Sequence, residues 1–336
     1  MAWLGLDIGG ANIKVADGRG FAESFPFALW QAPQQLGLQL RTVIAQSPPC
    51  DHLAITMTGE LADCYASKEE GVRAILDAVE EAGAGRHTRV YLTSGSLVTL
   101  PVARGRTAEV AAANWHALAR FAGRFAHQGT GILIDIGSTT TDIIPLHEGQ
   151  VAANGMTDTE RLISGELVYL GVERTPVCAV ADHVPYRGHR PSLARELFAT
   201  LRDVFLVLDQ VEESASDRNT ADGRPATKAA ARVRLGRMIC ADAEQFHHRD
   251  AVEMANSLSR QALQLVKADF QRVLARLATP PARVIMAGQG EFLARQLLQS
   301  LDSPLPSFSL NRELGTRVSR CAPAHALAVL ARELSS

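Results

Sequence analysis

Two short stretches of this 336-residue chain repeat one arrangement of carboxylate, glycine and small polar side chains. They are residues 4–14 (LGLDIGGANIK) and residues 132–142 (ILIDIGSTTTD), in which Asp7 aligns with Asp135. Each is an apolar run that ends in Asp, followed by a Gly-containing turn and a second apolar run, which predicts a β-hairpin. Two such hairpins facing one another would form a cleft lined with backbone N–H groups and carboxylates, suited to a phosphate chain and its metal ion.

The first stretch contains the residue types that hold phosphate. Gly9 and Gly10 permit close backbone approach and positive φ angles, and successive N–H groups in such a turn can cradle an anion. Lys14 would add a positive charge and Asn12 a neutral donor. At the end of the strand, Asp7 would hold Mg²⁺ directly or through water. The competing interpretation is a hairpin whose glycines only make a tight turn.

The second stretch offers four hydroxyl groups, at residues 138–141, between Asp135 and Asp142. Threonine runs are common in ordinary strands, so the hydroxyl groups alone carry little weight. The alignment of Asp and Gly in both stretches favours a paired site for phosphate and metal. The predicted phosphate-binding residues are Gly9, Gly10, Asn12, Lys14, Gly137, Ser138, Thr139 and Thr140, and the predicted metal ligands are Asp7 and Asp135.

A third polar turn follows a predicted strand over residues 283–287. It contains Gly288, Gly290 and Glu291, and such a turn suits a place where a nucleotide or another flat ring passes close to the backbone. A simple turn between a strand and a helix is the alternative. Further polar residues follow strands or lie on loops, where binding residues are common but helix caps and surface turns are equally expected. The predicted substrate-binding residues among them are Thr58, Glu60, Asp158, Arg174, Asp222 and Arg224.

Strands and helices alternate along the chain, which indicates an α/β layered fold. Ser67 is expected to cap a helix whose first turn contains Glu69 and Glu70. Besides the hairpins, strands are predicted over residues 52–57 and 90–92, and helices over residues 33–46, 67–83, 108–127, 292–301 and 324–334.

The length of the chain favours two domains of similar size. We expect an N-terminal domain over residues 1–128 and a C-terminal domain over residues 129–336, each built around one of the hairpins. Residues 190–275 are expected to form a mainly helical insertion in the second domain. The last helix is expected to pack back on the first domain.

The composition indicates which binding partners and which cellular compartment are expected. The net charge is −2 and no long basic run is present, so neither nucleic acid nor an anionic membrane is an expected partner. The five cysteines are widely spaced and form no C-x-x-C motif, which favours a reducing compartment without disulfides or a structural zinc site. No signal-peptide pattern is present, and no apolar stretch approaches the ~20 residues that span a bilayer. A cytoplasmic protein is expected.

The three polar turns, in this order, resemble the phosphate-1, phosphate-2 and adenosine motifs of the sugar kinase, Hsp70 and actin superfamily. That resemblance implies two RNase-H-like domains with ligands in the cleft between them. Residues 57–63, 165–176 and 220–225 are similar to the hydantoinase/oxoprolinase-related branch of this superfamily. Within that branch the chain resembles the condensing enzymes of methanofuran and methylofuran biosynthesis and related proteins of the tetrahydromethanopterin-linked one-carbon pathway.

The resemblance implies a transferase that joins an aminomethylfuran methyl diphosphate to the phenol oxygen of a γ-glutamyl-tyramine or tyrosine-type acceptor and releases diphosphate. Mg²⁺ is the expected cofactor, and Asp7, Asp135 and Asp142 are unranked candidates for accepting the phenol proton. The alternative is an ATP-dependent small-molecule kinase or a hydantoinase/oxoprolinase-like ATPase. A non-catalytic phosphate-binding subunit is a third hypothesis, and homodimerisation is left open.

Overall fold

The first of two β-sheets contains the N-terminal hairpin, in a computed structural model that describes residues 1–335. Its strand order is β3-β2-β1-β4-β5-β6. β1 to β3 form an antiparallel meander, and β4 and β5 continue the sheet parallel to β1. The strands are β1 (Trp3–Ile8), β2 (Asn12–Ala16), β3 (Ala22–Pro26), β4 (His52–Met57), β5 (His87–Tyr91) and β6 (Leu97–Val98).

The second sheet repeats this arrangement around the second hairpin. Its order is β10-β8-β7-β11-β12, with antiparallel pairing on the β8 side of β7 and parallel pairing on the β11 side. β9 is an additional partner of β8. The strands are β7 (Thr130–Ile136), β8 (Thr141–His147), β9 (Gln150–Val151), β10 (Leu167–Val168), β11 (Arg283–Ala287) and β12 (Ser307–Ser309). Both predicted hairpins and the α/β class are therefore confirmed, and the two sheets share one five-strand topology.

Two helices cover the face of the first sheet that points away from the second. They are α1 (Leu36–Ala45) and α2 (Lys68–Ala82), whose apolar sides pack on β1 and β4. The predicted cap of α2 is confirmed, because Ser67 Oγ accepts a hydrogen bond from the Glu70 N–H at 3.1 Å. The short helices α3 (Leu100–Arg104) and α4 (Thr107–Val110) follow β6.

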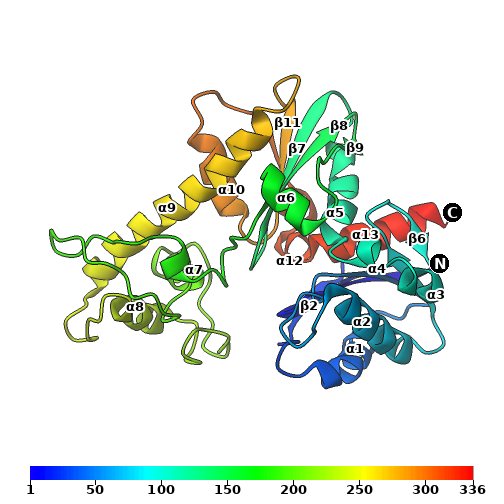
Figure 1. Cartoon of the computed structure of the whole chain (residues 1–336), viewed down its shortest axis with the longest axis horizontal. Coiled ribbons are helices and arrows are strands. Elements are labelled where there is room, and N and C mark those ends of the chain that lie inside the picture. The colour runs from blue at the N-terminus through cyan, green and yellow to red at the C-terminus, as the bar shows by residue number, and fades with distance from the viewer. Residues whose placement is uncertain (336) are drawn as a thin grey trace.

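Two helices lie between the sheets, where Figure 1 shows α13 (Ala322–Leu334) and α5 (Asn114–Ala122) side by side. Almost every residue of α13 is buried, as expected for a helix with apolar neighbours on all sides. Its Leu327 and Leu330 pack against the first sheet, whereas Ala326 and Val329 belong to the core of the second sheet and α5. A helix from the end of the chain thus supports β1.

The single helix predicted over residues 108–127 is wrong. The chain forms α4, a break at residues 111–113, α5 and a 3-10 turn at Gly123–Phe125. Ala112 adopts a φ of +49°, which no helix accommodates and which costs energy for a residue with a Cβ. Alanine favours a helix locally, but packing of α5 on the second sheet and α4 on the first overrides that preference.

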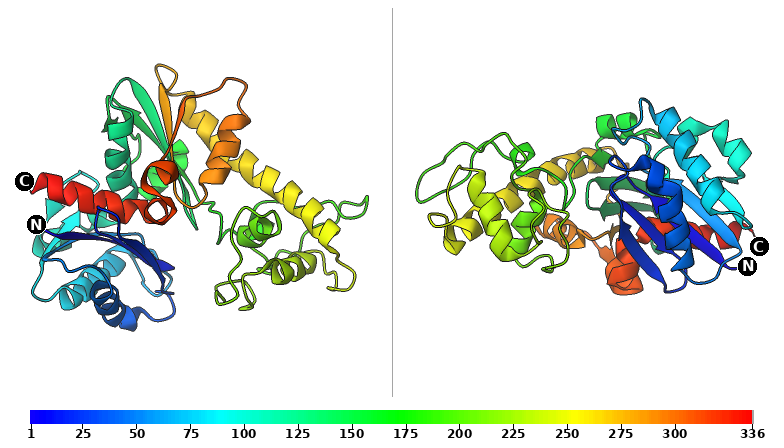
Figure 2. Two further views of the ribbon diagram at one scale, coloured as in Figure 1. Left: turned by 180° about the vertical axis from the view of Figure 1, so that it is seen from behind. Right: turned by 90° about the horizontal axis from the view of Figure 1, so that it is seen from below.

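The segment between the strands β10 and β11 contains the remaining long helix and a lobe of irregular chain. α9 (His248–Leu274) extends from the second sheet, and the segment holding α7 (Leu201–Val207) and α8 (Lys228–Arg237) lies at its far end in all views (Figures 1 and 2). The other helical segments of this half are α6 (Asp158–Ser164), Val177–Ala179, α10 (Glu291–Gln299), α11 (Leu310–Leu314) and α12 (Thr316–Arg320). Within residues 1–335, none of the helices has the length and apolar character needed to cross a membrane.

Candidate active site between the two sheets

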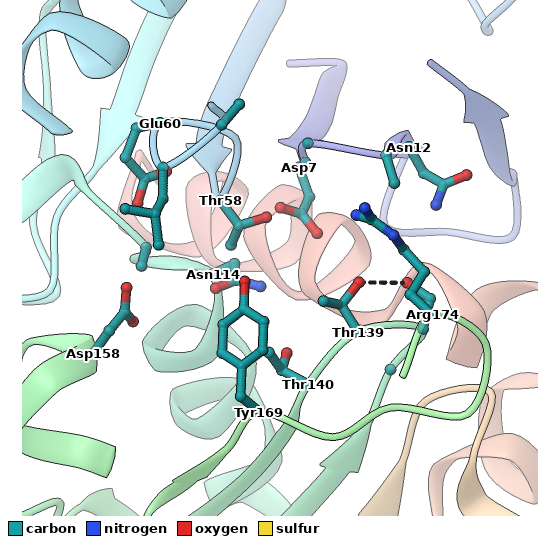
Figure 3. A pocket seen from close by; sticks show the side chains of 18 of the residues that line it. Asp7, Asn12, Thr58, Glu60, Asn114, Thr139, Thr140, Asp158, Tyr169 and Arg174 are labelled. Carbon is teal, nitrogen blue, oxygen red and sulfur yellow. Dashed lines mark hydrogen bonds between the residues drawn. The ribbon is translucent and has the colours of Figure 1, made fainter. Parts of the chain in front are cut away.

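A cavity of about 470 Å³ lies between the two halves, with walls from both hairpins. Figure 3 shows polar side chains converging on it from the ends of β1, β4, β7 and β8 and from the loops that follow β10. The predicted site residues that line it are Asp7, Gly9, Gly10, Asn12, Lys14, Thr58, Glu60, Asp135, Gly137, Ser138, Thr139, Thr140, Asp142, Asp158 and Arg174.

The two hairpin turns close with the same hydrogen bond. The Gly9 N–H donates to the Asn12 carbonyl at 3.0 Å, and the Gly137 N–H donates to the Thr140 carbonyl at 2.8 Å. Of the two properties that these glycines permit, positive φ is not used, since neither Gly9 nor Gly10 adopts it. Close approach is what Gly9 provides, because a Cβ there would lie 2.9 Å from the Asn12 carbonyl oxygen, whereas a Cβ at Gly10 would meet no protein atom within 4 Å.

Asp7 ends β1 and faces Lys14 across the hairpin. The two residues are register partners, and Lys14 Nζ lies 3.9 Å from Asp7 Oδ2. Burial raises the pKa of the Asp7 carboxyl, which Lys14 opposes and the charge of Asp142 reinforces. Asp7 Oδ1 is buried and has no hydrogen-bond partner among residues 1–335. A buried, unpartnered carboxylate oxygen in a cavity is suited to receive a ligand.

Asp135 and Asp142 are the equivalent register pair in the second hairpin. Burial and then the like charge of Asp142 raise the pKa of Asp135 to about 7, against the opposing effect of Lys14. Burial also raises the pKa of Asp142, although Arg161 opposes this with an Nη1–Oδ1 contact of 2.5 Å. Two carboxylates this close cannot both ionise without a compensating cation.

That cation is Arg161, which is 2% exposed and projects from α6. Its guanidinium donates to Asp142 and, at 3.1 Å, to Asp158, and it lies 4.4 Å from the ring centroid of Trp115. Asp158 also accepts a 2.7 Å hydrogen bond from Lys68 Nζ of α2. One end of the cleft is therefore bridged by an ion pair that connects the first half of the chain to the second.

A cation–aromatic contact bridges the other end. The Arg174 guanidinium lies 4.8 Å from the ring centroid of Trp30. The backbone around Arg174 is held on the second hairpin, because the N–H groups of Glu173 and Arg174 both donate to the Ser138 carbonyl. Trp30, Leu61, Tyr169 and Leu197 add an apolar wall to this polar cleft.

Two predicted substrate residues lie elsewhere. Asp222 accepts hydrogen bonds from Arg234 at 3.0 Å and Arg237 at 3.2 Å, inside the lobe that contains α8. Arg224 is exposed on the same loop. Neither residue is among those that line the cavity. Asp222 helps to neutralise the fully buried Arg234, and substrate binding by Asp222 and Arg224 remains a prediction.

The G-x-G turn adjoins the site without lining it. Gly288 has a φ of +83°, and a Cβ there would lie 2.4 Å from Asp135 Oδ1, so this turn packs directly behind that carboxylate. The Gly290 N–H donates to the Ile136 carbonyl at 2.9 Å. Glu291 is buried and accepts hydrogen bonds from Ser309, Asn311 and Arg295. These contacts give the turn a structural task, and ring binding by it remains a prediction.

Sequence patterns did not single out several residues that shape the cleft. Trp30 and Asn114 line it, and Ala112 reaches it through the break in the predicted helix. Arg161 looked like one polar residue among many, because its partner Asp142 lies on a different element. The sequence does contain one signal for such a residue. Asp135 and Asp142 lie opposite each other in the second predicted hairpin, and two neighbouring carboxylates require a positively charged side chain from another element.

A model of the hydantoinase/oxoprolinase family matches residues 51–331 of the chain. This match covers most of the sequence, from β4 to α13. The chain belongs to the hydantoinase/oxoprolinase family.

Within the family, the chain is similar to two archaeal proteins that share one name, (4-{4-[2-(γ-L-glutamylamino)ethyl]phenoxymethyl}furan-2-yl)methanamine synthase. The protein from Methanocaldococcus jannaschii is 34% identical over 330 residues, which cover 97% of this chain and 96% of that protein. The protein from Methanococcus vannielii is 30% identical over 201 residues, covering 59% of this chain and 89% of its own length.

Solved structures with the same overall fold are distant in sequence. The nucleotide-free structure of an ATP-dependent acetone carboxylase matches with a TM-score of 0.50 and 10% identity, covering 97% of this chain and 70% of that one. A similarity at this level describes the fold of this hydantoinase/oxoprolinase family member and leaves its ligands open.

The residues of the cleft could hold Mg²⁺ only together with oxygen atoms of a bound substrate. No group of three or more His, Cys, Asp or Glu side chains in the described part of this family member could hold a metal ion. Mg²⁺, however, is commonly bound by one or two carboxylates together with substrate phosphates and water. Asp7, with its unpartnered oxygen, would supply one such carboxylate, and Asp135 of the facing hairpin lines the same cavity.

Proposed function

We propose that this chain is a transferase of methanofuran-type cofactor synthesis. It would condense an aminomethylfuran methyl diphosphate with the phenol oxygen of a γ-glutamyl-tyramine or tyrosine-type acceptor. In this step the phenol oxygen forms a bond to the furylmethyl carbon, the bond from that carbon to diphosphate breaks, and the phenol gives up its proton. The observation that carries the proposal is the 34% identity to the Methanocaldococcus jannaschii synthase over 97% of the chain.

The cleft has the two kinds of surface that this reaction needs. The turns after β1 and β7 offer backbone N–H groups and hydroxyls to a diphosphate, with Lys14 and Arg174 as nearby cations. The apolar wall of Trp30, Leu61 and Tyr169 suits a furan or a phenol ring. Holding both rings against each other converts an encounter in solution into a reaction within one complex.

Diphosphate departure is helped by charge that the protein provides. The open space at Gly10 lets phosphate oxygens approach the first turn without meeting a side chain. Ser138 and Thr139 present hydroxyls on the facing turn. Mg²⁺, held by Asp7 and the diphosphate, would neutralise charge on the leaving group when bound. These groups act where negative charge develops, which is where electrostatic stabilisation accelerates a reaction.

We assign the phenol proton to Asp135. Asp142 is a weaker candidate because its carboxylate is already paired with Arg161. The pKa of Asp135 is raised to about 7, so this carboxylate combines a substantial ionised fraction near neutral pH with the basicity of a proton acceptor. Asp7 keeps the unpartnered oxygen that suits metal binding.

The proposal is tested by following diphosphate release from the purified full-length protein. The assay contains an aminomethylfuran methyl diphosphate, a phenolic acceptor and Mg²⁺, and mass spectrometry measures the ether product. We expect one diphosphate released for each ether formed. ADP production from ATP in the presence of the acceptor, without diphosphate release from the furan donor, would instead establish the ATP-dependent alternative and overturn the proposal.

A further inference from the structure

The end of the cleft at Glu60 and Asp158 contains carboxylates but neither of the Gly-containing hairpin turns that could hold a phosphate. In Figure 3 these two carboxylates lie on one side of the cavity, and Asn12 and Arg174 lie on the other. Asp63 also lines the cavity, whose hairpin end contains Asp7, Asp135 and Asp142. The nearby cations are committed, because Lys68 pairs with Asp158 and Arg161 pairs with both Asp142 and Asp158. A negatively charged ligand group therefore has little reason to enter this end.

Glu60 is the most unusual group at this end. It is 1% exposed, lines the cavity, and its Oε2 atom has no hydrogen-bond partner in the described chain. A buried, unpartnered carboxylate oxygen costs free energy unless a ligand satisfies it. Burial raises the pKa of Glu60 to about 7, with a smaller contribution from Asp158. The backbone N–H of Ala112 and the charge of Lys68 act in the opposite direction.

The chain beside Glu60 is strained. Ala112, whose N–H favours the ionised form of Glu60, adopts a φ of +49° and interrupts the helix expected over this region. Alanine is costly in that conformation, and such strain is commonly kept where a site depends on it. The strained peptide and the unpartnered carboxylate meet in the same corner of the cavity.

We propose that Glu60 binds a primary ammonium group carried by the ring of the substrate. The inference rests on the proposed function, because the name of the archaeal relative describes a furan ring that carries an aminomethyl group. A donor with an ammonium at one end and a diphosphate at the other matches a cleft with an unpartnered carboxylate oxygen at one end and the Gly-containing hairpin turns at the other. Glu60 is then a specificity residue that orients the ring.

The test compares two donors that differ only in the amine. One is (5-(aminomethyl)furan-3-yl)methyl diphosphate, the substitution pattern in the relative's name, and the other is (5-methylfuran-3-yl)methyl diphosphate, each assayed for diphosphate release with a phenolic acceptor. We expect the wild-type protein to prefer the amine by roughly 30- to 100-fold in kcat/KM, the range of a hydrogen bond to a charged group. Glu60→Gln should lose most of that preference by slowing only the amine donor.

Glu69→Gln is the matched control, since Glu69 is an exposed glutamate nearby that pairs with Arg73 on the surface of α2. It should retain the full preference. If Glu60→Gln slows both donors equally, Glu60 serves the reaction itself, for example as the proton acceptor, and the ammonium site is refuted. The same conclusion follows if the wild-type protein does not distinguish the two donors.

A binding measurement separates this inference from the proposed function. Thermal shifts of the wild-type protein with furfurylamine and with furfuryl alcohol need no turnover. We expect stabilisation by the amine alone and its loss in Glu60→Gln. If no donor releases diphosphate but furfurylamine still stabilises the wild-type protein through Glu60, the proposed reaction fails and the ammonium site stands. Absence of stabilisation by furfurylamine overturns the site.

Discussion

The two hairpins share a backbone but differ in charge at one aligned position. Lys14 and Asp142 occupy equivalent places, each paired in register with the Asp at the end of the preceding strand. In the first hairpin this makes an opposite-charge pair with Asp7 at 3.9 Å. In the second it makes a like-charge pair with Asp135, which depends on Arg161 from α6 for compensation. The first hairpin therefore contains the cation that pairs with its aspartate, whereas the cation that pairs with the second hairpin comes from α6.

Because of this difference, Asp7 and Asp135 are suited to different tasks. Asp7 keeps an unpartnered oxygen beside a lysine, a combination that suits a metal ion and a phosphate. Asp135 is pushed toward protonation by burial and by Asp142, a combination that suits proton transfer near neutral pH. Two hairpins with the same pairing therefore present chemically distinct surfaces, which differ in charge at Lys14 and Asp142.

Removing Arg161, the cation that pairs with the second hairpin, should have the largest effect on stability. Arg161→Ala leaves Asp142 and Asp158 buried without their shared partner, so we expect a loss of about 3–5 kcal/mol in the free energy of unfolding. Urea denaturation measures it. Arg73→Ala, which removes an exposed pair on α2, is the control and should cost less than about 0.5 kcal/mol. Equal effects of the two substitutions would show that the second hairpin does not depend on Arg161.

Neutralising Asp135 in the second hairpin should slow turnover strongly while leaving the fold intact. For Asp135→Asn we expect a loss of about 10²–10³-fold in kcat, the range found when one group that acts on the transition state is removed. The acidic limb of the pH–rate profile near pH 7 should disappear, because the pKa of Asp135 is about 7 in the wild-type protein. An unchanged profile with a raised Mg²⁺ requirement would identify Asp135 as a metal ligand instead.

Burial of Asp135, together with the like charge of Asp142, should also make stability fall with rising pH. The pKa of Asp135 is raised in the folded protein, so between about pH 4 and pH 7 the folded state binds more protons than the unfolded state. The free energy of unfolding without Mg²⁺ should therefore decrease by roughly 2–4 kcal/mol over this range. Asp135→Asn should make the dependence less steep, with the contribution of Glu60 remaining, as measured by denaturation at several pH values. A stability that rises over this range would contradict the assigned charge state.

The smallest effect should come from the turns themselves. Gly9→Ala places a Cβ 2.9 Å from the Asn12 carbonyl oxygen, whereas Gly137→Ala places its Cβ at an ordinary 3.5 Å from the Thr140 carbonyl oxygen. We expect about 1 kcal/mol of destabilisation for the first and less than about 0.5 kcal/mol for the second. Thermal denaturation of the two variants under identical conditions compares them. A larger destabilisation by Gly137→Ala than by Gly9→Ala would show that the distance from the added Cβ to the facing carbonyl oxygen does not determine the effect.

Local patterns were sufficient wherever neighbours in sequence define the structure. The alternation and turn residues predicted both hairpins, and Ser67 predicted the start of α2. The same approach failed at residues 108–127, where alanine propensity indicated one helix and packing on two different sheets broke it. It also could not place Asp222, a predicted substrate residue, which the fold pairs with a buried arginine in the lobe that contains α8.

By itself the sequence determined a duplicated hairpin with phosphate-binding residues and paired aspartates, because period, turn chemistry and spacing are local properties. Only the tertiary structure decided what those aspartates can do. The pKa of a carboxyl depends on burial and on charges a few ångströms away, and those charges come from Arg161 on α6 and from Lys14 across the cleft. The acidic corner at Glu60 arises in the same way, since α2, α6 and the strained chain at Ala112 meet there only after folding.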